Sequence, residues 1–456
     1  MKKELDLTQG SILPRLMRFA LPVLLALFLQ SMYGAVDLLV VGKFSDPADV
    51  SAVSTGSMLM MTLTGIVSSL GMGMTIFLGQ KIGEKKPREG GQIVGSGLVL
   101  FLGLGVLLTL AVALGANVLA GTMRAPAEAY PRTAAYIRIC GAGALAIIAY
   151  NLIGSIFRGL GDSRTPLVTV MIACGLNIGG DLLLVAVFHL GAAGAAAATV
   201  FAQLVSVGLS VLMIRRASLP IELERDMVRW NGAVVRKIVS LGAPIALQDF
   251  LVGVSFLVVL AIVNSLGVTA SAGVGVAERV CAFIMLVPLA FMQSMSAFVA
   301  QNRGAGRLDR AVLGLRYAIG VSVVISVTMA WLSYFHGDML SRIFARDEAV
   351  ILASAQYLKA YALDCLLTSF LFCFIGFFNG MELTRFVMVQ GLVGAFLVRV
   401  PVSFLMSRWE PVSLFRVGLA TPCSSLVQIL LCFGCMVYVK KRMLSAAGAD
   451  LPGAEG

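Results

Sequence analysis

Long apolar runs, separated by short polar segments, occupy most of this chain. A helix needs roughly 20 mostly apolar residues to cross the hydrocarbon core of a bilayer, and twelve of the runs reach that length. The pattern therefore predicts an all-α polytopic membrane protein with twelve transmembrane helices. The predicted spans cover residues 15–42, 51–80, 93–119, 132–158, 166–188, 192–214, 235–264, 271–301, 312–335, 351–378, 386–407 and 413–439.

Composition supports this prediction and excludes other classes of protein. Apolar residues make up 59% of the 456 positions and charged residues only 13%, about half the charged share of soluble domains. These values exclude an ordinary soluble enzyme, a disordered chain and a collagen-like chain. The first apolar run, from Leu16 to Val41, is too long for the apolar region of a cleavable signal peptide.

Basic residues are distributed unevenly between the two sides that the spans define. The net charge is +11, from 35 basic and 24 acidic residues. One side carries 24 basic residues, beginning with Lys2 and Lys3, and the other carries 7. Because cytoplasmic loops are enriched in lysine and arginine, we expect a multi-pass protein of the inner (cytoplasmic) membrane with both termini in the cytoplasm. The basic residues lie between apolar runs rather than on one face, so no nucleic-acid partner is indicated.

A polar stretch near the midpoint, residues 217–234, has the composition of a linker and leaves six spans on each side. It divides the chain into an N-terminal lobe, residues 1–216, and a C-terminal lobe, residues 235–456. Several residue types recur after 221 positions, which indicates a parallel repeat of the kind found in secondary transporters. The recurring pairs are Gln80 and Gln301, Gly83 and Gly304, Tyr136 and Tyr357, Phe157 and Phe378, Gly159 and Gly380, and Arg164 and Arg385, with Pro22 and Pro244 matching after a one-residue slip.

Polar residues inside the spans of the first half are candidates for a site. An ionisable side chain at bilayer depth costs roughly 3 kcal/mol or more, so it indicates a functional role. Asp37 shares one helical face with Tyr33 and Gln30, which precede it by four and seven residues. Asn177 and Asp181 are one helical turn apart, so their side chains can reach the same place.

Asp37, Asn177, Asp181 and Thr199 together offer only oxygen ligands and amide or hydroxyl donors. Such a set suits a hard cation such as Na⁺, and two carboxylates in a dry environment could alternatively share one proton. A further interpretation is that the acids only bond to neighbouring polar groups. The repeat favours a single ion site in the N-terminal half, because the equivalent positions of the second half are all apolar. Those positions are Val258, Val398, Val402 and Ala420.

Two further acids, Asp249 and Asp364, occur inside spans of the second half only. They could line a substrate cavity, with Gln30 and Tyr33 as further candidates, or they could pair with arginine or backbone groups. Glu278 and Arg279 are adjacent and therefore face different directions, which favours structural roles for both.

Catalytic or cofactor chemistry is not indicated. The two histidines, His189 and His336, lie at predicted helix ends, and the Cys432-x-x-Cys435 spacing lies within a lipid-length helix, where core packing is the favoured interpretation. No GxxxxGK[ST] motif occurs, so transport would use an ion gradient rather than ATP hydrolysis. We therefore expect no enzyme activity and no cofactor, with Na⁺ or H⁺ as the coupling ion.

The chain resembles the multidrug and toxic compound extrusion (MATE) family over nearly its whole length. The similarity lies in segments spread across both halves. These are TQGSI at 8–12, LPVLLALFLQSMYGAVDLLVVGKF at 21–44, FRGLGDSRTPL at 157–167, NIGGDLLL at 177–184, GAAGAAAATV at 191–200, NSLG at 264–267 and VPLAFMQSMSAFVAQNRGAG at 287–306.

This resemblance implies a V-shaped pair of six-helix lobes that exports organic cations or similar xenobiotics in exchange for Na⁺ or H⁺. In archaeal and DinF-like members the N-lobe cation site corresponds to Asp37, Asp181, Asn177 and Thr199 of this sequence. NorM-like members also carry an acidic residue eight positions after the proline of helix seven, where this chain has Val252, so the acidic residues are closer to the DinF-like pattern. The expected partners are small organic cations or drugs and the lipid bilayer, and a monomer is expected.

Three other functions are considered. A flippase for lipid-linked precursors, from the same superfamily, would be expected to have more spans and a cationic central cavity. A membrane-embedded enzyme would need a catalytic constellation that two terminal histidines do not supply. A passive channel would leave the two-lobe repeat unexplained.

Overall fold

The computed structural model describes residues 6–216 and 219–449. These residues form helices and contain no strand. Eleven helical stretches are long and apolar enough to cross a membrane, and a bent pair makes a twelfth. The prediction of an all-α protein with twelve membrane-spanning helices is therefore confirmed. Lys2 and Lys3, and residues 217–218 of the predicted linker, lie outside the described residues.

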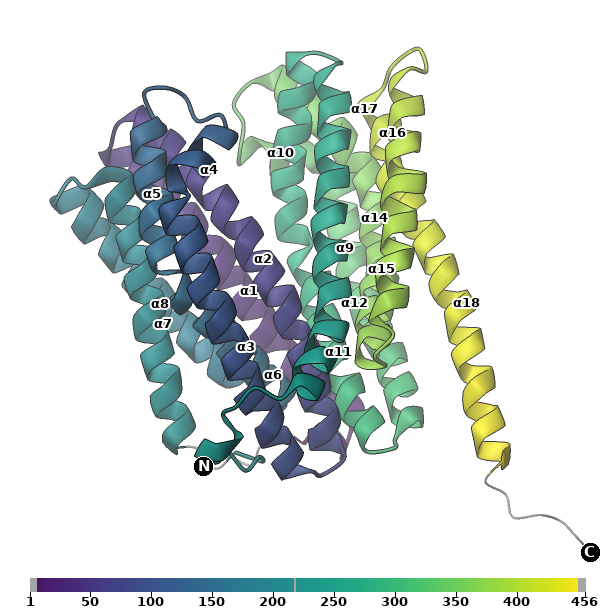
Figure 1. Ribbon diagram of the computed structural model, residues 1–456. Coiled ribbons are helices and arrows are strands. Elements are labelled where there is room, and N and C mark those ends of the chain that lie inside the picture. Colours follow the sequence, from purple (N-terminus) through teal and green to yellow (C-terminus); the bar gives the residue numbers. More distant parts are fainter. Residues whose placement is uncertain (1–5, 217–218, 450–456) are drawn as a thin grey trace, which may run out of the picture. The chain divides into compact units, whose positions relative to one another are not determined.

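The spans follow one another with short connections (Figure 1). In the first half they are α1 (Ile12–Phe44), α2 (Pro47–Gly83), α3 (Pro87–Leu114), α5 (Tyr130–Ala142) with α6 (Ala144–Gly159), α7 (Arg164–Asp181) with a π-helix (Leu182–Val187), and α8 (Gly191–Arg216). In the second half they are α9 (Gly232–Asn264), α10 (Val268–Ile284) with α11 (Leu286–Gly304), α12 (Leu308–Phe335), α14 (Glu348–Gly380), α15 (Thr384–Leu392) with a π-helix (Val393–Arg399) and α16 (Val400–Ser407), and α17 (Leu414–Gly418) with α18 (Ala420–Ala449). The short helices α4 (Ala116–Thr122) and α13 (Gly337–Arg342) and a 3₁₀ turn (Arg225–Met227) complete the order.

Helix bounds in the two halves repeat with the spacing found in the sequence. Helix α2 spans Pro47–Gly83, and its counterpart, α10 with α11, spans Val268–Gly304, 221 positions later at both ends. The same spacing separates both ends of α3 and α12. The packing repeats as well, since two equivalent glycines lie against equivalent neighbours. Gly159 packs on Thr75 and Leu78, and Gly380 packs on Ser296 and Val299.

Prolines lie within several of these helices, where each one lacks the N–H that would bond to the residue four positions earlier. Pro22 lies inside α1 and Pro244 inside α9. Pro288 lies just after the break between α10 and α11, and Pro401 lies in the first turn of α16.

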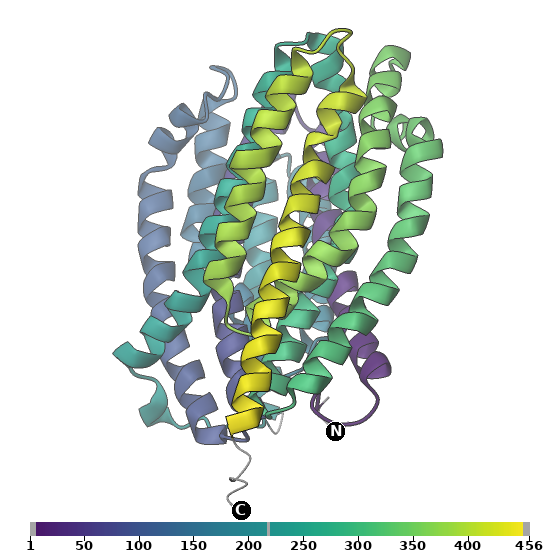
Figure 2. The same cartoon turned by 90° about the vertical axis from the view of Figure 1, so that its right-hand side faces the viewer.

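The helices form two compact units (Figures 1 and 2). Unit 1 comprises the described residues up to Phe250, together with Leu289–Ala318 and Gly376–Arg385. Unit 2 comprises Leu251–Pro288, Ile319–Ile375 and the described residues from Phe386 onward, and in it α18 runs alongside α16 (Figure 2). Unit 1 thus takes in end segments of second-half helices, so these units differ from the sequence halves. The lobes assigned from the sequence stay a prediction.

Within unit 1, the ends of α2 and α11 meet through two equivalent glycines. A Cβ atom built on Gly83 would lie 2.9 Å from the carbonyl carbon of Gln301 and nearer still to its oxygen. Reciprocally, a Cβ on Gly304 would lie 2.8 Å from the carbonyl carbon of Gln80. Because real Cβ atoms essentially never come within 3.0 Å of such atoms, both positions require glycine for this approach.

The predicted linker packs against α3 in unit 1. The Glu222 N–H donates to the Pro87 carbonyl oxygen over 3.2 Å, and the Ser96 hydroxyl donates to the Arg229 carbonyl oxygen over 3.0 Å. Gly91 and Gly95, one helical turn apart on α3, face the linker backbone and leave room for it. This part of the linker is therefore a packed element of unit 1.

Candidate cation site

Helices α1, α7 and α8 pack against one another in unit 1. Small residues permit this close approach, as they do at many helix contacts in membranes. A Cβ on Gly180 of α7 would lie 2.9 Å from the Ala198 Cβ of α8. Ala198 is the last residue of a run of glycine and alanine at 191–198. The packing brings together the four residues predicted for the cation site, which come from three different helices.

Thr199 connects the other members of this site. Its hydroxyl donates to Asp37 Oδ2 over 3.3 Å and accepts from Asn177 Nδ2 over 3.3 Å. Asp37, Asn177 and Asp181 are only 5%, 2% and 0% exposed, so none of the three is hydrated as a surface group would be. The Asp37 and Asp181 carboxyl groups also interact with each other across α1 and α7.

The oxygen atoms of the site can accept more hydrogen bonds than the surrounding protein groups donate to them. Four buried oxygens, Asp37 Oδ1, Asn177 Oδ1 and both carboxyl oxygens of Asp181, accept no hydrogen bond from the described residues. A buried acceptor without a donor is costly, and two facing carboxylates repel each other. A hard cation or a shared proton would remove both costs. The described residues contain no cluster of three or more His, Cys, Asp or Glu suited to a metal, so amide and hydroxyl oxygens would have to complete any cation shell here.

The supporting residues on α1 lie close to this site. Tyr33 lines a small cavity with Asn177, Thr199 and Gln203. Sequence reasoning missed Gln203, although it lies one helical turn after Thr199 on α8 and so shares its face. The spacing alone would have identified it.

Gln30, one turn before Tyr33 on the same face, reaches Tyr150 of α6. Its amide nitrogen lies 3.4 Å from the Tyr150 hydroxyl. Tyr150 also lines the cavity that contains Tyr33. No pattern in the sequence singled out Tyr150, since its role depends on how α6 packs against α1.

The two acids of the second half do not share a site in the structure. Asp249 lies in unit 1, is exposed and accepts a hydrogen bond of 2.6 Å from the Ser69 hydroxyl of α2. Asp364 lies in unit 2, is fully buried and interacts with Ser425 and with the guanidinium of Arg399. Their roles in substrate binding stay predictions.

Arg399 is the centre of a buried polar group in unit 2. It donates to the Ser255 hydroxyl over 3.0 Å, and its guanidinium lies 4.1 Å from the centroid of the Phe256 ring. Glu278 interacts electrostatically with the same arginine, and the Tyr357 hydroxyl lies 3.5 Å from a Glu278 carboxyl oxygen. Arg399 therefore interacts electrostatically with both Asp364 and Glu278, whereas the carboxyl oxygens of Asp364, like those of Asp181, accept no hydrogen bond from the described residues.

These features define a polytopic helical membrane protein, built from a repeated set of spans, with buried facing acids in its first half. The MatE family model matches the chain twice, over residues 22–183 and 244–405. The protein belongs to the MatE family, and the two matches bear out the internal repeat.

Individual relatives agree with this assignment. The chain is 27% identical over 419 residues to "Probable multidrug resistance protein YpnP" of Bacillus subtilis (strain 168), covering 89% of this chain and 91% of the relative. It is 21% identical over 401 residues to "Multidrug export protein MepA" of Staphylococcus aureus (strain NCTC 8325 / PS 47), covering 88% of each. A solved structure described as the outward-facing conformation of a multidrug resistance MATE family transporter matches with a TM-score of 0.90 at 18% identity, over 98% of this chain and 99% of the other, which shows the shared fold.

Proposed function

We propose that this protein is a secondary active antiporter that exports lipophilic organic cations or drugs in exchange for Na⁺ or H⁺ by alternating access. Membership of the MatE family and the names of its multidrug resistance and export relatives support this class of transport. The span count does not favour the flippase alternative, for which more than twelve spans were expected. The protein is expected in the inner membrane as a monomer with both termini in the cytoplasm, with no enzyme activity and no cofactor besides the coupling ion.

One observation carries the coupling scheme, namely the buried oxygens of Asp37, Asn177 and Asp181 that lack donors. When both carboxyls are ionised they repel each other, and Na⁺ or a proton relieves that repulsion. Asp37 lies on α1 and Asp181 on α7, so ion binding changes which packing of these two helices is favoured. Exchange then requires that ion and substrate each disfavour the state that binds the other.

Ethidium efflux in everted membrane vesicles tests this proposal. Na⁺ and pH gradients are imposed separately, so the gradient that drives transport identifies the coupling ion. Asp37→Asn and Asp181→Asn should abolish gradient-driven efflux while immunoblots show normal amounts in the membrane. Asp309→Asn, at an exposed acid in the first turn of α12, is the control and should leave efflux unchanged. Wild-type efflux in both site variants would refute the proposed site.

A further inference from the structure

In unit 1, the segment that precedes the first helix of each half packs on helices of the other half. Residues 7–10 precede α1 and bond to the ends of α11 and α12, and the linker precedes α9 and packs on α3. The one-residue slip found for the repeated prolines also places Gly10 on Gly232, the first residue of α9. The two segments are therefore equivalent parts of the repeat, and residues 7–10 are called the N-terminal strap.

Every backbone carbonyl oxygen of the N-terminal strap accepts a hydrogen bond from a side chain at the ends of α11 and α12. Arg310 alone serves three of the four oxygens, and Arg307 and Asn302 provide the other bonds. The bonds are Arg310 to Leu7 over 3.3 Å, to Gln9 over 2.9 Å and to Gly10 over 2.6 Å, Arg307 to Thr8 over 2.9 Å, and Asn302 to Leu7 over 3.2 Å. Because charged donors form stronger hydrogen bonds than neutral ones, Arg310 is the principal anchor of the strap.

The N-terminal strap and the linker are held in different ways. The linker backbone fills a notch at α3, where a Cβ on Gly95 would lie 2.6 Å from the Met227 carbonyl carbon, and the linker buries the side chains of Ile221 and Met227. Detaching it would expose both apolar side chains to water. In the strap only Leu7 is fully buried and Gln9 is exposed, so water can replace most of its hydrogen bonds at little net cost. The strap is therefore the segment that can detach more easily.

Release of the strap would act on helix α1. Residues 7–10 lead directly into α1, which begins at Ile12 and carries Asp37 of the cation site. While the strap is bound, the start of α1 is tied to the ends of α11 and α12, which belong to the second half of the repeat. Alternating access moves one repeat against the other, so this tie would have to open in each cycle.

We propose that the N-terminal strap is a releasable latch, anchored by Arg310, that holds the start of α1 against α11 and α12 and opens once in each transport cycle. This inference rests on the proposed efflux function, because the cycle is that of the antiporter. A strap that contributes only to folding would stay bound throughout, so closing it permanently would leave transport unchanged.

Thiol accessibility measures whether the strap detaches. Cys423 and Cys435 are first replaced by serine, because the remaining native cysteines are buried, and Leu7→Cys or Gln9→Cys is then added. Labelling with a polar maleimide is followed on purified protein in nanodiscs. The Leu7→Cys thiol should react about tenfold more slowly than the Gln9→Cys thiol, which corresponds to about 1.4 kcal/mol. It should nevertheless react to completion, as a segment that opens transiently does.

Variants of α12 assign this protection to Arg310. In the Leu7→Cys background, Arg310→Gln removes the charged fork and should speed labelling about fivefold. Arg310→Lys keeps the charge without the fork and should give an intermediate rate. Arg316→Gln, at an exposed arginine of the same helix, is the matched control and should leave the rate unchanged.

Three labelling results would overturn the latch. They are equal rates for Leu7→Cys and Gln9→Cys, no reaction of Leu7→Cys at all, and no acceleration by Arg310→Gln.

A reversible crosslink tests whether transport requires release. Thr8→Cys and Arg307→Cys are combined in the same background, because the Arg307 side chain reaches the Thr8 backbone, and a short bis-thiosulfonate reagent joins the two thiols in everted vesicles. Crosslinking should abolish ethidium efflux and a reductant should restore it. Each single-cysteine variant, treated in the same way, should keep its efflux. Undiminished efflux in the crosslinked protein would overturn the latch.

These measurements separate failure of the latch from failure of the efflux function. Labelling of Leu7→Cys needs no substrate, so it decides whether the strap detaches even in a protein that exports no ethidium. Absence of ethidium efflux before crosslinking would refute the efflux function, whereas normal efflux with the strap closed would refute the latch alone.

Discussion

Replacing Gly83 by alanine tests whether the close approach of α2 and α11 stabilises this arrangement of unit 1. The added methyl group would meet the backbone of Gln301, with the carbonyl carbon and the Ala305 nitrogen both at 2.9 Å. These atoms belong to a helix end and cannot rotate away as a flexible side chain would. The two helix ends must therefore move apart.

The size of the effect follows from the contact. Ordinary van der Waals contact of a Cβ begins near 3.4 Å, so the carbonyl carbon alone requires the helices to separate by about 0.5 Å, and the nearer carbonyl oxygen of Gln301 requires more. Overpacking of this kind costs roughly 1–3 kcal/mol. A buried hydrogen bond of 3.0 Å from Gln301 Nε2 to the Gly159 carbonyl oxygen lies beside the contact, and separation would strain it too. We expect the population of this packed arrangement to fall roughly 5- to 150-fold relative to alternatives.

Gly65→Ala is the matched control, because it lies on the same helix and a Cβ there has no neighbour within 4 Å. That substitution should leave stability unchanged or raise it by about 0.5–1 kcal/mol, since alanine favours helix over glycine. Gly304→Ala, at the equivalent position of α11, should reproduce the effect of Gly83→Ala.

The assay combines thermal unfolding with a distance measurement between spin labels at positions 88 and 309. Arg88 and Asp309 are exposed, lie 221 positions apart and belong to unit 1. Cys423 and Cys435, the two cysteines that are not fully buried, are first replaced by serine. Gly83→Ala should lower the melting temperature and lengthen or broaden the distance distribution. Identical melting temperatures and distributions in Gly83→Ala and Gly65→Ala would refute the reasoning.

Three further predictions concern other parts of the molecule. Thr199→Val removes the hydroxyl that connects Asp37 and Asn177, and in vesicle efflux it should weaken the apparent affinity for the coupling cation roughly 3- to 10-fold. Thr199→Ser should restore that affinity, and an unchanged cation dependence in Thr199→Val would argue against the bridge. Gly95→Ala should lower the melting temperature because its methyl group would meet the linker backbone, whereas Gly103→Ala on the same helix has open space and should not. Arg399→Gln removes the cation that interacts electrostatically with Asp364 and should lower the melting temperature. Adding Asp364→Asn should recover part of that loss, with a coupling energy of about 0.5–3 kcal/mol, and simple additivity of the two losses would contradict the interaction.

The number and order of the spans could be predicted because every span is a long apolar run and most of the connections between spans carry charged residues. The bends and helix ends within the spans could not be predicted, because they depend on tertiary contacts. Residues 132–158 were predicted as one continuous span, but α5 and α6 meet at Gly143 with a bend of 52°. The predicted third span ran to residue 119, whereas α3 ends at Leu114 and the short α4 follows Gly115. In both places a glycine marks the interruption, yet many other glycines of this chain lie within uninterrupted helices.

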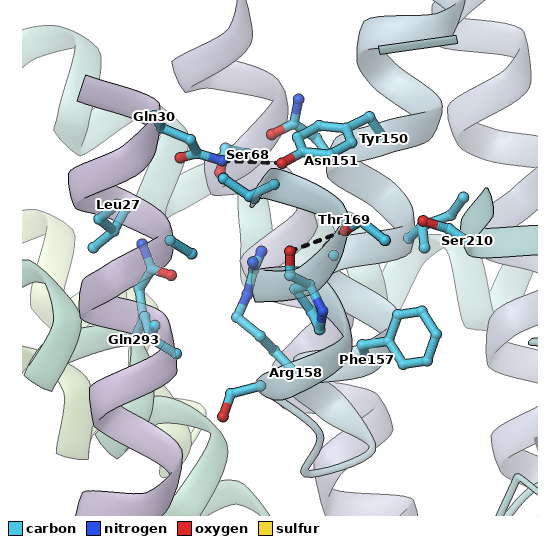
Figure 3. A pocket seen from close by; sticks show the side chains of 17 residues that line it. Leu27, Gln30, Ser68, Tyr150, Asn151, Phe157, Arg158, Thr169, Ser210 and Gln293 are labelled. Carbon is cyan, nitrogen blue, oxygen red and sulfur yellow. Dashed lines mark hydrogen bonds between the residues drawn. The ribbon is translucent and has the colours of Figure 1, made fainter. Parts of the chain in front are cut away.

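The candidate site was predictable to the extent that local spacing determines it. Asn177 and Asp181 share a face of one helix by their spacing alone. Asp37 of α1 was grouped with them because it is an acid inside a span of the same half, and the resemblance to the MATE family implies the same set. The approach between these helices depends on packing of small residues such as Gly180 and Ala198. Arg158 lies at the end of the predicted span 132–158, where a charge indicates only orientation. Its position in a polar cavity (Figure 3) depends on how α1 and α7 pack against α6.

Helix α1 is the element that the two polar regions of unit 1 have in common. Its residues Leu27 and Gln30 line a polar cavity of about 70 Å³ together with Arg158 of α6, and Asp37 lies further along the same helix in the cation site. Pro22, inside α1, removes one backbone hydrogen bond, which lowers the cost of bending the helix. If ion binding at Asp37 displaces this part of α1, we expect the wall of the cavity to move with it, because the helix is continuous from Leu27 to Asp37. Such a shared element is what coupling between ion and substrate requires, since each ligand can then bias the same helix toward a different position.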